Sequence, residues 1–384
     1  MSTVVATDVR ACVNNGRYYF KSQVAVILKR YYESFGKLTI CCRLSKVEDM
    51  SASLIDVTDM IEDIVLISSL EKVILGFYDE EIKQVIKKSD FVICRCPGMI
   101  SHRVAEFAKK GGKPYLAESM GCAWDAYWNH GVIGKTVAPY VYFKMKKVVY
   151  NADYALYVTS QFLQERYPCK NESISASNVL IETIDKDVLK RRLEKIACFD
   201  RNLITLMTTA AVDVRYKGQE FVIKAIPKLN KAGIRVHYIL VGGGEQRYLK
   251  DVAKNCGVDE QVEFLGRCTL DEVIDFLDVA DIYIQPSLTE GLPRSMIEAM
   301  SRACPIIGAR TAGIPELIEE RFVVNRKSSF DIAEKIVAFS KMSSEELSNI
   351  AKRNFEESYN YEKDVLDARR NEYFEKIKTE LKKR

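Results

Sequence analysis

The residues that could do chemistry are concentrated in one run, 286–300, which contains two acids, Glu290 and Glu298, with seven residues between them. A short strand is expected to end near Gln285, a turn rich in glycine and proline follows, and a helix is expected to start at about Pro293, because proline suits the first helical position. The amino end of a helix offers unpaired N–H groups and partial positive charge, which together make an anion site. One acid precedes that site, and the other lies about one and a half turns inside the helix. The run can therefore hold a phosphate with hydroxyl groups on either side, which is the charge pattern of a nucleotide-sugar.

Two basic residues could add positive charge to such a site. Arg215 and Lys217 follow a predicted strand, 203–208, in a short run that ends in Gly218. Because they are two residues apart, both side chains can face one side of an extended loop. The alternative is a surface loop with two solvated bases.

Three glycines, Gly242 to Gly244, follow the predicted strand 236–241. The dinucleotide fingerprint G-x-G-x-x-G needs a sixth-position glycine after the first strand of a domain. Here the sixth position is Arg247, and the run lies deep in its domain. We interpret the run as a loop that allows close backbone approach to a ligand, and a tight turn that caps a helix explains it equally well.

The run 286–300 resembles the donor-binding motif of retaining glycosyltransferases of family 4, in the GT-B superfamily. The resemblance covers most of the C-terminal half and includes four further segments in the same order, 262–266, 280–287, 305–308 and 313–318. In the N-terminal half, the run 115–131 resembles the bacterial capsule and exopolysaccharide type more than the sucrose or glycogen type. An ordered set in its correct context is far more specific than two acids alone.

The resemblance implies an α/β fold of GT-B type, with two Rossmann-like doubly wound domains facing across a cleft. Residues 1–190 would bind the acceptor and residues 200–360 the donor, and a helix over 361–384 would cross back onto the N-terminal domain. The implied activity is transfer of a sugar, with retention of anomeric configuration, in bacterial surface polysaccharide biosynthesis. The donor would be a UDP- or GDP-sugar and the acceptor a glycan or a polyprenyl-diphosphate-linked glycan, without an obligatory cofactor or metal.

The resemblance also assigns roles to individual residues. Lys217, before a glycine, matches a phosphate-binding lysine. The family usually has an arginine several residues earlier, where Ala210 to Val212 stand, and Arg215 is the candidate to take its role. Glu290 would hold hydroxyls of the donor sugar and Glu298 the nucleotide ribose, although an i,i+4 pair between Glu298 and Arg294 is the alternative. The other residues expected at the donor are Gly291, Arg294, Ser295, Gly243, Gly244, Arg267 and Gly16.

The N-terminal half has weaker candidates for the acceptor. Glu118 is expected to end a strand at the place after which many family members carry a histidine, but in this chain His130 follows only twelve residues later. Both tryptophans lie in between. The face of Trp124 could form a platform for sugar C–H groups, although core packing is the more frequent use of tryptophan.

Apolar runs alternate with amphipathic stretches, which predicts parallel sheets covered by helices. The strands expected in the first half are 38–42, 73–77, 91–95, 114–118 and 155–159. A polar stretch over 184–202 breaks the pattern and is interpreted as a linker. The second half then restarts as a doubly wound domain, whose ligands are expected at the carboxyl ends of its strands.

Composition narrows the class of protein further. A chain of 384 residues is long enough for two domains, and its net charge of +4 does not indicate nucleic acid by itself. Eleven cysteines without a C-x-x-C pair, and only three histidines, do not predict a zinc site and fit a reducing cytosol. No signal peptide or membrane-spanning run is evident. Three basic clusters, 109–113, 144–147 and 186–195, are either solvated helix faces or a surface attracted to an anionic membrane or lipid diphosphate.

Two rival functions stay open at this stage. A nucleotide-sugar epimerase of the same fold would need no acceptor, and a non-catalytic sugar- or nucleotide-binding partner would not turn over its ligand. A glycosidase that uses the two acids is less favoured, because both acids lie beside an anion site.

Overall fold

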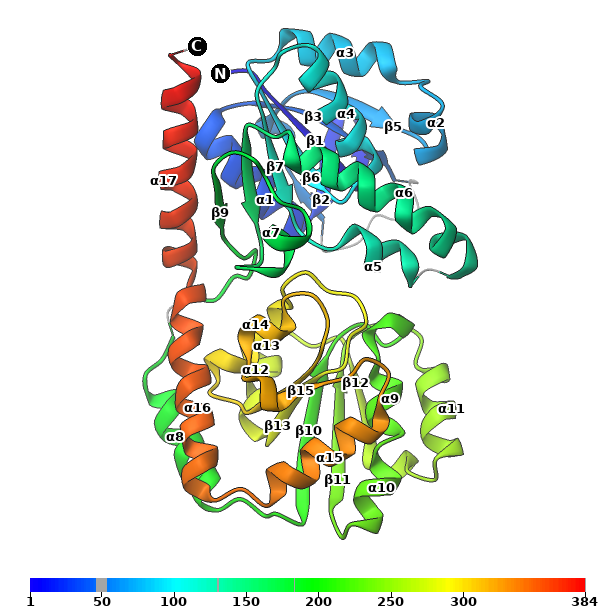
Figure 1. The fold of residues 1–384 in the computed structure, drawn as a ribbon, viewed down its shortest axis with the longest axis vertical. Helices are drawn as coiled ribbons and strands as arrows, with labels where there is room; N and C mark the ends of the chain where they lie inside the picture. Colours follow the sequence, from blue (N-terminus) through cyan, green and yellow to red (C-terminus); the bar gives the residue numbers. More distant parts are fainter. Residues whose placement is uncertain (46–53, 130, 183, 384) are drawn as a thin grey trace. The chain divides into compact units, whose positions relative to one another are not determined.

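The computed structural model describes residues 1–45, 54–129, 131–182 and 184–383, which form two compact units (Figure 1). Unit 1 comprises Met1–Ala176 and Ala368–Arg384, and unit 2 comprises Ser177–Asp367. Each unit has its own sheet, mostly or wholly parallel.

The sheet of unit 1 has seven parallel strands in the order β5-β3-β1-β6-β7-β8-β9, and an antiparallel extension in which β2 pairs with β1 and β4 pairs with β2. The bounds are β1 Thr3–Asn14, β2 Arg17–Lys21, β3 Leu38–Leu44, β4 Leu54–Asp56, β5 Ile61–Ile67, β6 Phe91–Cys96, β7 Tyr115–Ser119, β8 Tyr154–Tyr157 and β9 Ser173–Ser175.

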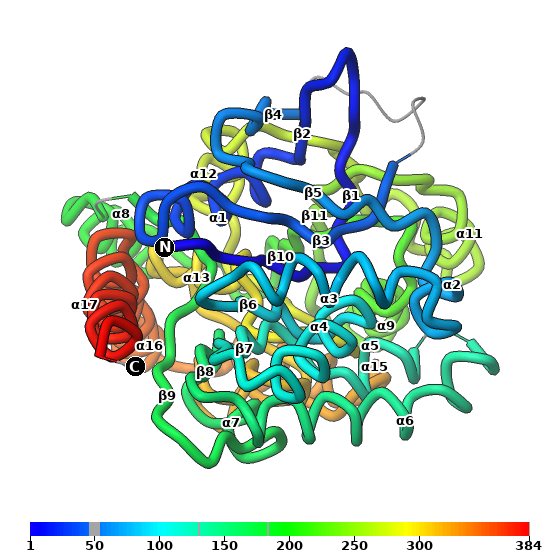
Figure 2. Tube along the Cα trace, turned by 90° about the horizontal axis from the view of Figure 1, so that it is seen from above, coloured from blue at the N-terminus to red at the C-terminus, as the bar shows by residue number. Residues whose placement is uncertain are grey.

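Helices cover both faces of this sheet. Their bounds are α1 Ser22–Phe35, α2 Leu70–Ile74, α3 Asp79–Lys88, α4 Met99–Lys110, α5 Ala123–Trp128, α6 Gly131–Tyr150, α7 Phe162–Arg166 and α17 Lys363–Leu381, with a short turn η2 at Thr58–Met60. Figure 2 shows α1 and α17 on one side of the strands, and α3, α4 and α6 on the other. The first face buries an aromatic cluster in which Phe374 of α17 lies 5.1 Å, between ring centroids, from Phe35 of α1.

The sheet of unit 2 is parallel throughout, in the order β12-β11-β10-β13-β14-β15. Its strands are β10 Leu203–Thr209, β11 Arg235–Val241, β12 Val262–Gly266, β13 Ile282–Gln285, β14 Ile306–Ala309 and β15 Val323–Val324. The α-helices are α8 Asp187–Ala197, α9 Gln219–Ile223, α10 Ile226–Lys231, α11 Arg247–Asn255, α12 Leu270–Val279, α13 Arg294–Ser301, α14 Ile314–Leu317, α15 Ser329–Ser340 and α16 Ser344–Ser358. Short 3₁₀ turns are η3 Arg215–Lys217, η4 Asp259–Gln261, η5 Glu320–Phe322 and η6 Tyr359–Tyr361.

Two sequence predictions about these elements were wrong. The predicted strand 73–77 is the end of α2 and the turn after it, because Ser69 caps the helix and accepts from the Lys72 backbone N–H. Gly76, with a φ of +82°, then turns the chain. A short apolar run cannot be assigned to helix or strand by periodicity alone.

The predicted linker 184–202 contains α8, a packed helix of unit 2. Its Arg192 is only 4% exposed and donates to three backbone carbonyls, those of Leu277, Ala280 and Arg302. These carbonyls lie at the carboxyl ends of α12 and α13, where helices leave acceptors unpaired. This charged stretch therefore contains a buried arginine, Arg192, whose hydrogen bonds hold α8 against the ends of α12 and α13.

Candidate anion site at the carboxyl edge of the unit 2 sheet

The carboxyl ends of β10 and β13 define the candidate site. These strands are neighbours, and the chain leaves β10 for β11 on one side, whereas β13 continues to β14 on the other. This reversal of strand order is a topological switch point, where the loops diverge and ligands bind in open α/β sheets. Lys217 follows β10 and Glu290 follows β13, so both candidates lie at this point.

The loops after β10 and β13 pack tightly against each other at Gly218. This residue has a left-handed backbone with a φ of +78°, and a Cβ added there would lie 2.2 Å from the Pro286 carbonyl oxygen. The Leu288 N–H donates to the Tyr216 carbonyl over 2.7 Å. Only glycine combines this backbone with so close an approach, and the result is a fixed position for Lys217 beside the second loop.

Lys217 and Glu290 form an ion pair, with 2.7 Å between Nζ and Oε1. The two side chains are 23% and 12% exposed, so the pair is sheltered but still reaches solvent. The Gln285 Nε2 also donates to the same Glu290 oxygen over 3.1 Å. A cation is therefore held at the switch point next to an acid that has a second hydrogen-bond donor.

A buried polar network beneath this pair sets its geometry. The Tyr283 hydroxyl lies 2.9 Å from both Gln285 Oε1 and Ser295 Oγ, and the Gln285 Nε2 donates to Ser287 Oγ over 2.8 Å. These contacts orient the Gln285 amide so that its nitrogen faces Glu290. Sequence reasoning missed Tyr283 and Gln285, although polar residues that alternate with isoleucine in a buried strand are a signal for them.

The pKa of Tyr283 shows which groups surround it. Burial raises this pKa well above its usual value, and the charges of Glu298 and Glu290 raise it further. The hydrogen bond that the hydroxyl donates to Ser295, and the one that it accepts from the Thr209 N–H, lower the pKa in part. The hydroxyl therefore stays protonated and available as a donor. Both acids of the predicted pair lie near the same buried tyrosine.

The helix α13 begins one residue later than predicted, at Arg294, because Pro293 has an extended ψ of 115° and occupies the cap position. The cap residue itself makes no side-chain hydrogen bond to this amino end. Ser295, in the first turn, contacts the Tyr283 network. The Gly291 carbonyl accepts from the Gly313 N–H over 2.9 Å and fixes the preceding turn.

Glu298 lies in α13, one turn after Arg294, and is half-buried. The charge of Arg294, one turn earlier, acts on the Glu298 carboxylate, as the i,i+4 alternative expects. Burial raises the pKa of Glu298, and the charge of Arg294 opposes this only in part. A raised pKa means that the folded state binds this proton more tightly than the unfolded chain. The group therefore destabilises the fold increasingly as pH rises from the ordinary value of 4.5 through its raised value.

The glycine loop after β11 lies at the same carboxyl edge. A Cβ on Gly243 would lie 2.5 Å from Arg267 Nε, and one on Gly244 would lie 2.3 Å from Asp213 Oδ1. The Gly242 N–H donates to the Gly266 carbonyl over 2.7 Å. The loops after β10, β11 and β12 are thus packed together, with Arg267 lying across Gly243.

Arg215 does not join the Lys217–Glu290 pair. Its side chain is exposed, and its guanidinium carbon lies 4.2 Å from the centroid of the Tyr248 ring, on α11. This is a cation–π contact, which holds the guanidinium over the ring without using its N–H donors.

The candidates from the N-terminal half, Gly16 for the donor and Glu118 and Trp124 for the acceptor, belong to unit 1. Gly16 and Asn15 both have positive φ and form the two-residue turn between β1 and β2. Such Asn-Gly turns are the preferred connection in hairpins. Glu118 is buried at 2% exposure, pairs with Arg95 over 2.7 Å and accepts a hydrogen bond from the Tyr31 hydroxyl.

Trp124 lies in α5 and stacks on Trp128, with 5.0 Å between centroids and 18° between planes. Tyr142 contacts the same ring edge-on at 6.1 Å. Trp124 is half-buried and Trp128 is more exposed. The pair therefore lies at the edge of the core, with part of its ring surface open to solvent. His130 lies outside the described residues.

Comparison with known proteins finds similarity to glycosyltransferases. Residues 204–357 match the family model described as "Glycosyl transferases group 1". Protein CapJ of Staphylococcus aureus is 32% identical over 250 residues, which are 63% of this chain and 60% of CapJ. The colanic acid biosynthesis glycosyltransferase WcaL of Escherichia coli, a putative assignment in its own name, is 31% identical over 147 residues, 36% of each chain. The chain thus matches less than two thirds of the length of either relative.

Solved structures of low identity share the whole fold. The sucrose-phosphate synthase of Thermosynechococcus elongatus matches with a TM-score of 0.69 at 12% identity, over 98% of this chain and 99% of that one. Anabaena HepE, solved in complex with UDP and glucose, matches with a TM-score of 0.65 at 15% identity, over 98% and 100%. These likenesses and the two parallel-sheet units confirm the predicted α/β fold of GT-B type.

Proposed function

We propose that this protein, whose residues 204–357 belong to the group 1 glycosyl transferases, transfers a sugar from a nucleotide diphosphate-sugar to a glycan or lipid-linked acceptor. The proposal includes retention of anomeric configuration and a place in bacterial surface polysaccharide biosynthesis, as the names of WcaL and other relatives suggest. The observation that carries it is the Lys217–Glu290 ion pair at the switch point of the unit 2 sheet. The two residues lie in the segments that follow β10 and β13, and the second segment leads into the amino end of α13.

In this proposal the donor lies along the carboxyl edge of unit 2. Its diphosphate sits at the amino end of α13, where the backbone N–H groups near Arg294 and Ser295 meet negative charge. Glu298 accepts hydrogen bonds from the ribose diol, which would supply donors to a half-buried carboxylate. The remaining donor contacts come from Gly291, Gly243, Gly244 and Arg267.

The chemistry that follows is a front-face displacement. The bond from the anomeric carbon to the diphosphate oxygen breaks, an acceptor hydroxyl oxygen bonds to the same face of that carbon, and its proton passes to the departing diphosphate. Negative charge grows on that diphosphate in the transition state, so Lys217, Arg215 and the helix end stabilise it most at that moment, without an obligatory metal. Glu290 holds Lys217 before the donor arrives and then binds hydroxyls of the donor sugar.

The acceptor part of the proposal rests on unit 1. The stacked Trp124 and Trp128 offer an aromatic surface for a sugar, whereas Glu118 is engaged with Arg95 and Tyr31 and would act by supporting β7. A polyprenyl-diphosphate-linked acceptor would be reached from the cytoplasm at the inner face of a membrane.

A thermal-shift screen of UDP- and GDP-sugars tests the donor, because a ligand that binds only the folded state raises its melting temperature by mass action. We expect one nucleotide-sugar to stabilise the wild type and to stabilise Glu298→Gln much less. Turnover of that donor is then measured with and without glycan and lipid-linked acceptors. Isomerisation without acceptor would indicate an epimerase, and binding without any turnover would indicate a non-catalytic partner; either result refutes the transferase.

A further inference from the structure

The helix α6 is apolar on two faces, although only one of them packs in unit 1. The inward face consists of Ala138, Val141, Met145, Val148 and Val149, all buried. The outward face carries Val132 and Ile133, 79% and 81% exposed, together with Tyr140, Phe143 and Tyr150. A surface helix of a soluble domain is normally polar on its outer side, so this side is suited to contact something other than water.

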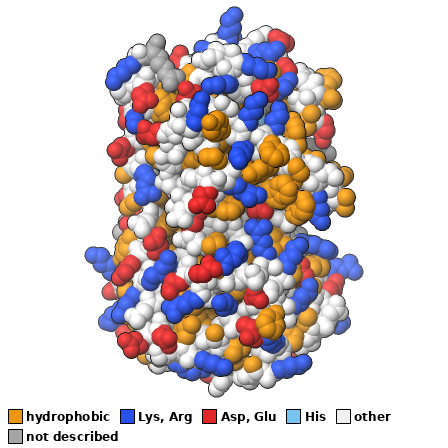
Figure 3. Space-filling view, viewed as in Figure 1, with side chains coloured by type: hydrophobic (Ala, Val, Ile, Leu, Met, Phe, Trp, Pro, Cys, Tyr) orange, Lys and Arg blue, Asp and Glu red, His pale blue; other side chains and the backbone are white. Residues whose placement is uncertain are grey.

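The charges of α6 are all of one sign. Its sequence contains Lys135, Lys144, Lys146 and Lys147 and no aspartate or glutamate. Two of these lysines lie over aromatic rings, Lys135 over Trp128 at 5.7 Å and Lys144 over Tyr140 at 5.6 Å. Figure 3 shows hydrophobic side chains gathered on this part of unit 1 with lysine and arginine side chains around them. Exposed aliphatic and aromatic residues mixed with lysine are typical of helices that lie in the interface of an anionic bilayer.

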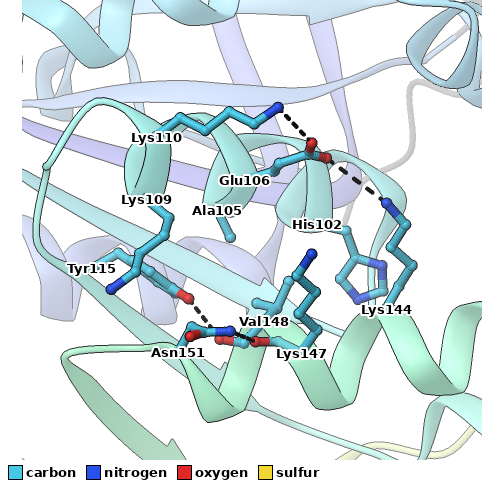
Figure 4. A pocket seen from close by; sticks show the side chains of 10 residues that line it. All are labelled: His102, Ala105, Glu106, Lys109, Lys110, Tyr115, Lys144, Lys147, Val148 and Asn151. Carbon is cyan, nitrogen blue, oxygen red and sulfur yellow. Dashed lines mark hydrogen bonds and ion pairs between the residues drawn. The ribbon is translucent and has the colours of Figure 1, made fainter.

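A groove between α4 and α6 continues this basic surface. It has a volume of about 150 Å³ and is lined at helical spacing by His102, Ala105, Glu106, Lys109 and Lys110 of α4, and by Lys144, Lys147, Val148 and Asn151 along and after α6. Figure 4 shows Lys110 and Lys144 directed to Glu106, while Lys147 projects between the helices. Pockets for drug-sized ligands usually measure about 300–1,000 Å³, so this groove fits a group the size of a phosphate rather than a nucleotide-sugar.

The positive charge of the groove comes from its lysines. Neither ring nitrogen of His102 has a hydrogen-bond partner among the described residues, and the side chain is 5% exposed. Burial lowers the pKa of His102 to about 4, with a further contribution from Lys144, so the ring is neutral near pH 7. Lys109 and Lys147 form no ion pair with any described residue, which leaves their charge for an external anion.

We propose that α6 and the α4–α6 groove bind the surface of an anionic phospholipid bilayer. Val132, Ile133 and Phe143 enter the interfacial region, and the lysines of α6 contact lipid phosphates, one of which the groove accepts beside Lys109 and Lys147. Charge complementarity selects the bilayer as the occupant, because the lysines of α6 lie among exposed aliphatic and aromatic side chains, and the acid in the groove, Glu106, is already paired with Lys110 and Lys144. The inference extends the proposed function, whose lipid-linked acceptor would lie in such a membrane, but its test does not depend on turnover.

Flotation with large unilamellar vesicles tests the proposal. The full chain is expected to bind vesicles of phosphatidylglycerol and phosphatidylcholine, to leave pure phosphatidylcholine vesicles unbound, and to dissociate as salt is raised. Lys146→Gln with Lys147→Gln should lower the partition constant about fivefold for each lysine. Val132→Asp with Ile133→Asp should abolish binding, and these side chains are too exposed for the change to affect folding.

The matched control is Leu75→Asp. Leu75 is 72% exposed on the same unit, but the acids Asp79, Glu80 and Glu81 follow it, so vesicle binding should not change. The proposal is overturned if the wild-type protein does not bind anionic vesicles. It is also overturned if both α6 variants still bind these vesicles. If Val132→Asp with Ile133→Asp changes the oligomeric state in gel filtration and leaves vesicle binding intact, the face joins copies of this chain instead. Nucleotide-sugar thermal shifts should be the same in all these variants, which separates this test from that of the donor site.

Discussion

Replacing Lys217 with alanine is the sharpest test of the site. The substitution removes the cation that lies 2.7 Å from Glu290 at the switch point. If that charge stabilises the departing diphosphate, its contribution is larger in the transition state than in the bound donor complex. We therefore expect kcat to fall about 100- to 1,000-fold, as when one preorganised donor is removed from an oxyanion site. The affinity for the donor should change far less.

The structure predicts that this loss is not caused by unfolding. The ion pair is partly solvated, and such pairs contribute about 0–1 kcal/mol. In the variant Glu290 keeps its hydrogen bond from Gln285, and so it is not left as an isolated buried charge. The free energy of unfolding should consequently fall by about 1 kcal/mol at most, as measured by urea denaturation.

Lys228→Ala is the matched control for Lys217→Ala. Lys228 forms an ion pair of similar length with Glu334, over 2.6 Å, but this pair is more exposed and joins α10 to α15. Lys228→Ala should lower the free energy of unfolding by a similar small amount and leave kcat unchanged. The reasoning about Lys217 is refuted if Lys217→Ala keeps kcat within threefold of the wild type, or if both variants lose activity equally.

Three further predictions follow from the geometry of unit 2. Glu298→Gln should raise the free energy of unfolding near neutral pH, and it should weaken donor binding measured by calorimetry. The difference in stability from the wild type should shrink as pH falls through the raised pKa of Glu298 towards 4.5. A difference that grows as pH falls contradicts the burial argument. Gly218→Ala should destabilise far more than Gly233→Ala in urea titrations, since both have positive φ but only the first meets a carbonyl, that of Pro286, and equal losses would show that the close approach can relax. Arg192→Ala should lower the free energy of unfolding by about 3 kcal/mol, because the buried carbonyls lose their hydrogen-bond donor. An unchanged melting temperature would show that these hydrogen bonds do not stabilise the fold.

Local pattern was sufficient to predict much of unit 2. The alternation of buried strands with amphipathic helices predicted the parallel strands, and the run 286–300 predicted a strand, a turn and a helix in the right order. These features depend on backbone preferences and on burial within a few residues, which a sequence expresses directly. The same kind of reasoning failed for α2 and α8. A short apolar run is ambiguous, and a charged stretch gives no sign that one of its arginines, Arg192, is buried.

The sequence by itself determined which residue types stand at the switch point, because the order of strands and the turns between them place Lys217, Glu290 and the start of α13 at one edge. Only the tertiary structure decided which of these residues meet. It paired Lys217 with Glu290, directed Arg215 to Tyr248 and half-buried the Glu298 carboxylate. The reason is that each of these outcomes depends on contacts between residues far apart in the chain, such as the approach of Gly218 to Pro286, whose distances no local pattern contains.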